Sequence, residues 1–231
     1  TSFELAAKRL TADTLAIAAS SSSSVKGETL HDTLANIEAM HSDVIVLRHS
    51  AAGAPHILAA RHESHIINAG DGRHEHPTQA LLDAFTIREH IRKLRQDPDA
   101  GLEGVRVAII GDVEHSRVAR SNIMCLNKLG AKVILCGPAT LMPAAVERMG
   151  VEVTHNLREA IEGADVIYSL RIQLERQQDG LFPSLREYIR LFRIDTAALA
   201  HAKSDAIIMH PGPINRDIEL STSVADGARS V

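Results

Sequence analysis

Aromatic and cysteine residues are scarce in this chain of 231 residues. It contains no Trp, 2 Tyr and 4 Phe, so aliphatic side chains and alanine must build its hydrophobic cores. The two cysteines, Cys125 and Cys136, lie in apolar stretches and lack the paired spacing of a zinc site. A reduced, cytoplasmic setting is the simplest interpretation of this cysteine usage.

Long apolar runs, a signal-peptide pattern and a strong net charge are also missing. No run approaches the roughly 20 apolar residues of a membrane span, so we expect no membrane partner. The net charge of −4 gives no overall attraction to nucleic acid. A hydrophobic content of 45% is enough for the core of one large domain or of two small ones.

Motifs for common cofactors and for covalent catalysis are absent from the sequence. Ile110-Gly111-Asp112 follows a predicted strand, but the G-x-G-x-x-G pattern of dinucleotide-binding folds is missing. His74 and His76 could converge on a metal, yet no Cys or carboxylate completes a ligand set at a characteristic spacing. No Ser or Cys stands in a G-x-S-x-G setting. We therefore expect neither a metal nor a cofactor.

Short apolar runs alternate with helical stretches along the chain. Apolar strands separated by helices indicate parallel sheets that are covered on both faces. The predicted strands are 14–18, 43–47, 65–68, 105–110, 132–136, 151–154, 165–170 and 206–210. The predicted helices are 28–41, 55–61, 77–94, 116–129, 143–149 and 157–163, with a further helical pattern from Thr1 to Ala7.

A polar, turn-rich stretch at 96–101 is the best candidate for a domain boundary. We therefore expect an α/β protein with two doubly wound parallel-sheet domains, residues 1–90 and 91–231, linked by the long helix at 77–94. Pro77 suits the first turn of that helix because its missing N–H group has no partner there.

Arg, His and Gln side chains follow five of the predicted strands. Ligands of such sheets bind beyond the carboxyl ends of the strands, so these side chains predict one shared cationic pocket between two domains. Such a pocket suits a small polyanion, because Arg grips carboxylate and phosphate through paired donors. Each arginine taken alone is more often a solvated surface residue. The residues concerned are Arg48, His49, 71–76, Arg117, Arg171, Gln173, Arg176 and 210–213.

The serine run 20–24, followed by Lys26, is a second candidate for anion binding. Hydroxyl groups and a lysine can hold phosphate, although a flexible solvated loop has the same composition. The glycine spacing of a Walker motif is absent. The residues alone leave both interpretations open.

Seven sequence blocks, in the same order, resemble the aspartate carbamoyltransferase family along almost the whole chain. The most specific is His76-Pro77-Thr78-Gln79-Ala80-Leu81-Leu82-Asp83. The others are Lys26-Gly27-Glu28-Thr29-Leu30, Leu47-Arg48-His49, Asn68-Ala69-Gly70-Asp71-Gly72, Gly111-Asp112 with 116–121, 171–176, and His210-Pro211-Gly212-Pro213. Seven blocks in the family's order make the resemblance specific, whereas any single block would be weak evidence.

The resemblance implies transfer of the carbamoyl group from carbamoyl phosphate to L-aspartate, the second step of pyrimidine (UMP) biosynthesis. It implies three catalytic groups, with Arg48 on phosphate and the carbonyl oxygen, His76 on that oxygen, and Gln79 on the carbamoyl NH2. The implied substrate-binding residues are Ser24, Lys26, Arg117, Arg171, Gln173, Pro211 and Gly212. It also implies a homotrimer with shared sites, alone or with regulatory or dihydroorotase chains.

The family pattern also gives expectations about the ends of the chain and about rival functions. The family's Ser-Thr-Arg-Thr-Arg phosphate loop would precede Thr1 and its C-terminal helix would follow Val231. We therefore expect both ends to be truncated and the 231-residue chain alone to have little activity. The alternatives are a non-catalytic scaffold and ornithine carbamoyltransferase. Arg171 with Gln173 favours a dicarboxylic amino acid over ornithine.

Overall fold

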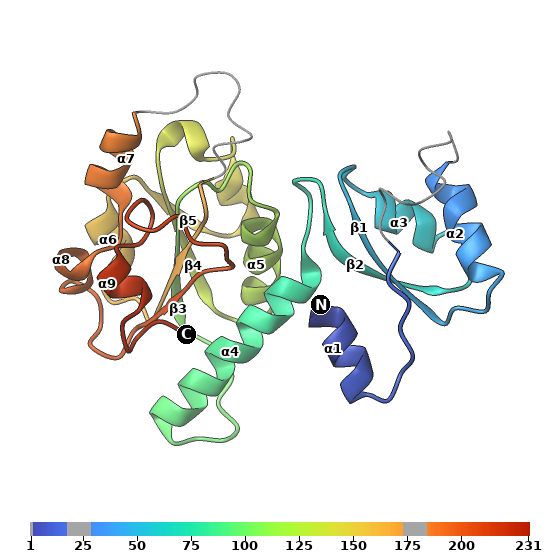
Figure 1. Cartoon of the computed structure of the whole chain (residues 1–231). Coiled ribbons are helices and arrows are strands. Elements are labelled where there is room, and N and C mark those ends of the chain that lie inside the picture. Colours follow the sequence, from blue (N-terminus) through green and yellow to red (C-terminus); the bar gives the residue numbers. More distant parts are fainter. Residues whose placement is uncertain (1, 18–28, 173–183) are drawn as a thin grey trace. The chain divides into compact units, whose positions relative to one another are not determined.

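The computed structural model describes residues 2–17, 29–172 and 184–231. The chain forms two compact units, Thr1–Gly72 and Arg73–Val231. Each contains a parallel sheet with helices, so the predicted α/β class with two parallel-sheet domains is confirmed (Figure 1). The long helix α4 (Pro77–Arg95) lies in the second unit. The limits 1–90 and 91–231 stay a prediction.

The first unit is built on a pair of parallel strands. Helix α2 lies within the predicted helix 28–41 and begins at Leu30, because the Thr29 side chain accepts a hydrogen bond from the Asp32 N–H and caps the first turn. Leu34, Ile45 and Leu58 form the buried centre of this unit. Its elements are α1 (Ser2–Arg9), α2 (Leu30–Glu38), β1 (Val44–His49), α3 (Ala54–Ala59) and β2 (His65–Asp71).

Two expectations for the first unit are wrong. Residues 14–17, the described part of the predicted strand 14–18, have no strand conformation, and Leu15 is 77% exposed. An apolar run becomes a strand only where a neighbouring strand can pair with it, and none of the described strands pairs with this run. Strand β2 also continues to Asp71, beyond the predicted end at residue 68.

The second unit has a five-stranded parallel sheet in the order β5-β4-β3-β6-β7. The first strand in sequence, β3, is central, and the chain moves outward to β4 and β5 before it returns to β6 and β7. This reversal makes the sheet doubly wound. The strands are β3 (Arg106–Ile110), β4 (Lys132–Cys136), β5 (Glu152–Thr154), β6 (Val166–Ser169) and β7 (Ile207–Met209).

Helices cover both faces of this sheet (Figure 1). Val107 and Ile109 of β3 pack with α4 and α5, whereas Ala108 and Ile110 pack on the opposite side with α6 and α7. The alternation follows from the two-residue period of a strand. The helices are α4, α5 (Arg117–Lys128), α6 (Leu157–Ile161), α7 (Leu185–Phe192), α8 (Thr196–Leu199) and α9 (Thr222–Ala225).

Helices α7, α8 and α9 were not predicted from the sequence, although α7 has a strongly amphipathic pattern. Within the predicted helix at 143–149, only Val146–Met149 is helical, as a short 3-10 turn, and a second 3-10 turn, Ala139–Leu141, precedes it. Ala145 has φ +57, which interrupts a right-handed helix at that point.

Candidate active site

Three neighbouring strands of the second unit end at one edge of the sheet and carry predicted site residues there. Because β3, β6 and β7 are adjacent and parallel, their carboxyl ends lie side by side. Arg171 follows β6, and Pro211-Gly212 follows β7. Arg117 opens α5, the helix that comes after β3. The structure thus brings these residues to one edge, as the sequence predicted.

Helix α5 begins at this edge with a side-chain cap. The Ser116 hydroxyl accepts a hydrogen bond from the Ala119 N–H at 3.1 Å. Arg117 is half-buried in the first turn, where the unpaired N–H groups of the helix favour an anion. Just before it, the buried His115 ring nitrogen Nδ1 lies 2.9 Å from Oδ1 of buried Asp112. This pair fixes the turn that positions Arg117.

The turn after β7 is held by hydrogen bonds from its own residues. The Gly212 N–H donates to Nδ1 of His210 at 2.9 Å, so a neutral His210 ring carries its proton on Nε2. That Nε2 lies 3.3 Å from Oε1 of fully buried Glu219. Asn215 Nδ2 donates to the carbonyl oxygen of Ile172 at 3.2 Å. The last bond ties the turn after β7 to the residue that follows Arg171.

Helix α4 presents His76 and Gln79 in its first turn. His76 is the N-terminal cap residue, and its backbone N–H donates to the Ser121 hydroxyl of α5 at 2.8 Å. The Thr78 hydroxyl lies 3.4 Å from His76 Nδ1. Gln79 Nε2 donates to Asp83 Oδ1 at 2.9 Å, one turn further along the helix.

Asp83 is the centre of a buried polar network that the sequence analysis missed. Its Oδ2 accepts a 2.7 Å hydrogen bond from the Tyr168 hydroxyl and a 2.9 Å bond from Asn122 Nδ2. Burial raises the pKa of Asp83, while the hydrogen bonds from Tyr168, Asn122 and Gln79 act to lower it. The four-residue spacing of Gln79 and Asp83 in the sequence places both on one helix face.

The remaining predicted residues lie elsewhere or outside the described ranges. Arg48 is exposed near the end of β1, in the first unit, whereas His76, Gln79, Arg117, Arg171, Pro211 and Gly212 belong to the second. Ser24, Lys26 and Gln173 lie outside the residues that the structure describes.

In the first unit, Asp71 Oδ2 accepts a 2.6 Å hydrogen bond from the Gly53 N–H, which fixes the turn between β1 and α3.

Comparison with known sequences and structures identifies the fold family. Residues 1–89 match "Aspartate/ornithine carbamoyltransferase, carbamoyl-P binding domain", and residues 103–231 match "Aspartate/ornithine carbamoyltransferase, Asp/Orn binding domain". The chain belongs to the aspartate/ornithine carbamoyltransferase family. It is 55% identical to the aspartate carbamoyltransferase catalytic subunit of Syntrophotalea carbinolica, over 100% of this chain and 71% of that protein. It is 57% identical to the same subunit of Syntrophus aciditrophicus, over 100% of this chain and 73% of that protein.

Solved structures of carbamoyltransferases share the fold. Aspartate transcarbamoylase from Trypanosoma cruzi in complex with N-(phosphonacetyl)-L-aspartic acid is 33% identical, with a TM-score of 0.83, covering 99% of this chain and 72% of that one. Ornithine carbamoyltransferase from Thermus thermophilus is 25% identical, with a TM-score of 0.73, covering 88% of this chain and 64% of that one.

A pocket of about 330 Å³ in this carbamoyltransferase chain lies beside the turn between β3 and α5. Its lining comes from that turn, which includes Glu114, from α5, which includes Arg120, and from residues 143–149, and it contains none of the predicted site residues. Among the described residues, no group of three or more His, Cys, Asp or Glu could hold a metal ion. Nor does any described helix have the length and apolar character needed to cross a bilayer.

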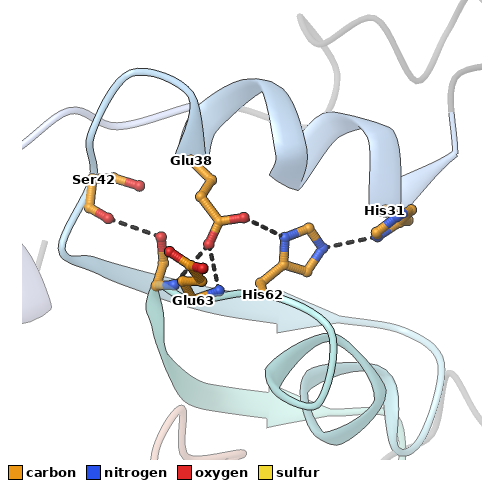
Figure 2. A network of polar contacts seen from close by, with 6 residues as sticks. His31, Glu38, Ser42, His62 and Glu63 are labelled. Atoms are coloured by element: carbon orange, nitrogen blue, oxygen red, sulfur yellow. Dashed lines mark hydrogen bonds and ion pairs between the residues drawn. The ribbon is translucent and has the colours of Figure 1, made fainter.

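A second polar network lies in the first unit of this family member, between α2 and the turn before β2 (Figure 2). The Glu38 carboxylate accepts bonds from the N–H groups of Glu63 and Ser64 at 2.6 and 2.7 Å. Its other oxygen lies 2.8 Å from Nδ1 of His62, whose Nε2 is 2.9 Å from Nδ1 of His31. These contacts fasten α2 to the turn at 62–64.

Proposed function

We propose that this chain transfers the carbamoyl group of carbamoyl phosphate to L-aspartate, giving N-carbamoyl-L-aspartate and phosphate. One observation carries the proposal. Arg117, Arg171 and the turn after β7 follow the adjacent strands β3, β6 and β7 at one edge of the second sheet. The high identity to proteins named aspartate carbamoyltransferase catalytic subunit supports the choice of aspartate over ornithine.

The reaction joins the aspartate amine to the carbonyl carbon and breaks the bond from that carbon to the phosphate oxygen. Negative charge develops on the carbonyl oxygen in the tetrahedral transition state. We assign Arg48 and His76 as the donors to that oxygen. The Thr78 hydroxyl lies 3.4 Å from His76 Nδ1. We assign the hydroxyl as the donor in this contact, so that a neutral ring carries its proton on Nε2, the nitrogen that donates to substrate. One such donor is typically worth ~3–4 kcal/mol.

We assign the two carboxylates of aspartate to arginines of the second unit. Arg117 takes the α-carboxylate, since it lies in the first turn of α5, where the helix dipole also favours an anion. Arg171 takes the side-chain carboxylate, and we assign Gln173, which lies outside the described residues, to the amine. The carbamoyl NH2 is held by Gln79 and the carbonyl oxygen of Pro211, with Gly212 in the same turn. Positioning and electrostatics then supply most of the catalysis.

The proposal extends to assembly and location. We assign Ser24 and Lys26, which lie outside the described residues, to the site of a neighbouring subunit. This assignment makes the active form a homotrimer with shared sites, alone or with regulatory or dihydroorotase chains. Val44 and Val46 of β1 are 49% and 43% exposed, an apolar face that further protein contacts would cover. We place the enzyme in the cytoplasm, because both cysteines are free thiols. Light scattering of the purified enzyme tests the trimer.

The decisive experiment compares carbamoylation of L-aspartate and L-ornithine by the protein that carries this chain. We expect turnover with aspartate only. Turnover with ornithine alone would replace the proposal by the ornithine activity. Calorimetry with N-(phosphonacetyl)-L-aspartic acid distinguishes the enzyme from the remaining alternative, a non-catalytic scaffold. A scaffold would neither bind this compound nor transfer the carbamoyl group.

A further inference from the structure

The Asp83 carboxylate collects hydrogen bonds from three elements of the second unit. Oδ1 accepts from Gln79 Nε2 on the same helix, whereas Oδ2 accepts from Asn122 Nδ2 on α5 and from the Tyr168 hydroxyl on β6. All three bonds are between 2.7 and 2.9 Å. Asp83 is 4% exposed, Tyr168 1% and Asn122 0%, so water does not compete strongly for these groups.

This arrangement decides which end of the Gln79 amide faces inward. An ionised carboxylate can only accept hydrogen bonds, so Gln79 must direct its NH2 group at Asp83. The amide oxygen, Oε1, is then the end left for other partners. None of the described residues donates to Oε1, and Gln79 is half-buried at the start of α4. The first turn of α4 therefore offers a fixed acceptor beside His76.

We propose that Asp83 is a positioning residue that sets donor-substrate specificity, by holding Gln79 with its amide oxygen ready to accept a hydrogen bond from the carbamoyl NH2. This inference rests on the proposed function, because it uses the assignment of Gln79 to the carbamoyl group. Acetyl phosphate carries a methyl group in place of NH2 and cannot donate that bond. A buried acceptor left without a donor is unfavourable, which disfavours acetyl transfer.

A simpler role for Asp83 is to fasten α4 to α5 and β6. Both roles predict that loss of Asp83 destabilises the fold, so stability does not separate them. They differ in substrate selectivity. Fastening alone affects carbamoyl and acetyl phosphate equally, whereas the orientation of Gln79 affects only a substrate with an N–H donor.

The first variant is Asp83→Asn, which keeps the size of the side chain. The Tyr168 hydroxyl and Asn122 Nδ2 both donate at Oδ2, so they hold the oxygen of the new amide at that position. Its NH2 group then faces Gln79 and turns the Gln79 amide around, with NH2 outward. We expect kcat/KM for carbamoyl phosphate to fall about 10–100-fold and that for acetyl phosphate to change less than about threefold.

The second variant combines Asp83→Asn with Gln79→Glu. The glutamate accepts from the new amide with one oxygen and offers the other to the carbamoyl NH2, so the acceptor is restored. We expect this double variant to recover about tenfold of the lost preference for carbamoyl over acetyl phosphate. Gln79→Glu alone places two carboxylates together and is expected to be less active than the double variant.

The matched control is Tyr168→Phe, which removes one donor from Oδ2 but leaves the carboxylate facing Gln79. We expect lower stability with an unchanged ratio of carbamoyl to acetyl transfer. Equal loss of both activities in Asp83→Asn, or a double variant no better than Gln79→Glu, would overturn the inference. If Asp83→Asn does not fold, the preference for carbamoyl over acetyl phosphate is compared between the double variant and Gln79→Glu, and this comparison still tests the inference. Failure of the proposed function itself is separate, since the wild-type enzyme would then not carbamoylate aspartate at all.

Discussion

The backbone of Gly137 lies so close to the carbonyl oxygen of Gly111 that no side chain fits between them. A Cβ atom added at Gly137 would overlap that oxygen. The Gly111 N–H donates to the Cys136 carbonyl oxygen at 2.8 Å, and Gly111 has φ +127, a value that favours glycine. The ends of β3 and β4 therefore approach through backbone alone, and this close approach positions Asp112 and the turn before α5.

Gly137→Ala is expected to destabilise the protein by about 1–3 kcal/mol or more, because the β3 and β4 ends must move apart. The measurement is the free energy of unfolding from urea denaturation. Gly101→Ala is the control, since a Cβ at Gly101 meets nothing within 4 Å and Gly101 needs no left-handed backbone. We expect this control to be neutral or to stabilise by up to about 1 kcal/mol. Equal effects of the two substitutions would contradict the proposed steric cause.

Glu38 is expected to make the stability of the first unit depend on pH in the acid range. The Ser64 N–H and then His62 lower the pKa of Glu38 from 4.5 to about 2. Because the folded pKa is below the unfolded one, the stabilisation is complete above pH 4.5 and is lost as pH falls toward 2.

Glu38→Gln tests this pH dependence directly. We expect it to lower the urea midpoint at pH 7, and the difference from wild type to shrink progressively between pH 4.5 and 2. Glu63→Gln is the control, because it keeps the backbone N–H that Glu38 accepts. A difference that stays constant over this pH range would show that the Glu38 charge is not responsible.

The two cysteines are expected to differ in reactivity toward alkylating reagents. Burial raises the pKa of Cys136 to about 12, and Cys136 is 0% exposed. Burial also raises the pKa of Cys125, but this residue is only half-buried on α5. Iodoacetamide at pH 8 should therefore label Cys125 slowly and Cys136 only after unfolding, since the thiolate is the reactive form. Mass spectrometry of the labelled peptides, with a Cys125→Ser control, measures the order. Labelling of Cys136 first would show that the end of β4 opens in solution.

Arg171→Ala is expected to weaken the use of aspartate far more than that of carbamoyl phosphate. Loss of a charged hydrogen bond costs about 1.5–3 kcal/mol, which corresponds to roughly a 10–150-fold rise in the KM for aspartate. Steady-state kinetics with each substrate varied in turn measures both constants. Arg186→Ala, on the exposed surface of α7, serves as a charge-matched control. Equal damage to both substrates in Arg171→Ala would remove its assigned role.

Local chemistry made much of the fold predictable. The strand 132–136 coincides with β4, and the caps at Thr29 and Ser116 start α2 and α5, because a cap depends on residues within one turn. The order of strands with cationic residues at their ends also placed Arg117, Arg171 and Pro211 at one edge of a sheet. The prediction failed at 14–18, where no described strand pairs with the run, at 143–149, where the positive φ of Ala145 interrupts a helix, and at α7, α8 and α9, which were not predicted.

The sequence by itself determined the α/β class, the parallel strands and the residue types at the strand ends, since periodicity and helix caps act over a few residues. Only the tertiary structure decided what surrounds Gln79. Asp83 meets Asn122 across 39 residues and Tyr168 across 85, and no local pattern encodes such contacts. They form because α4 and α5 pack on the same face of the sheet as Tyr168. Burial on that face strengthens the hydrogen bonds that orient the Gln79 amide.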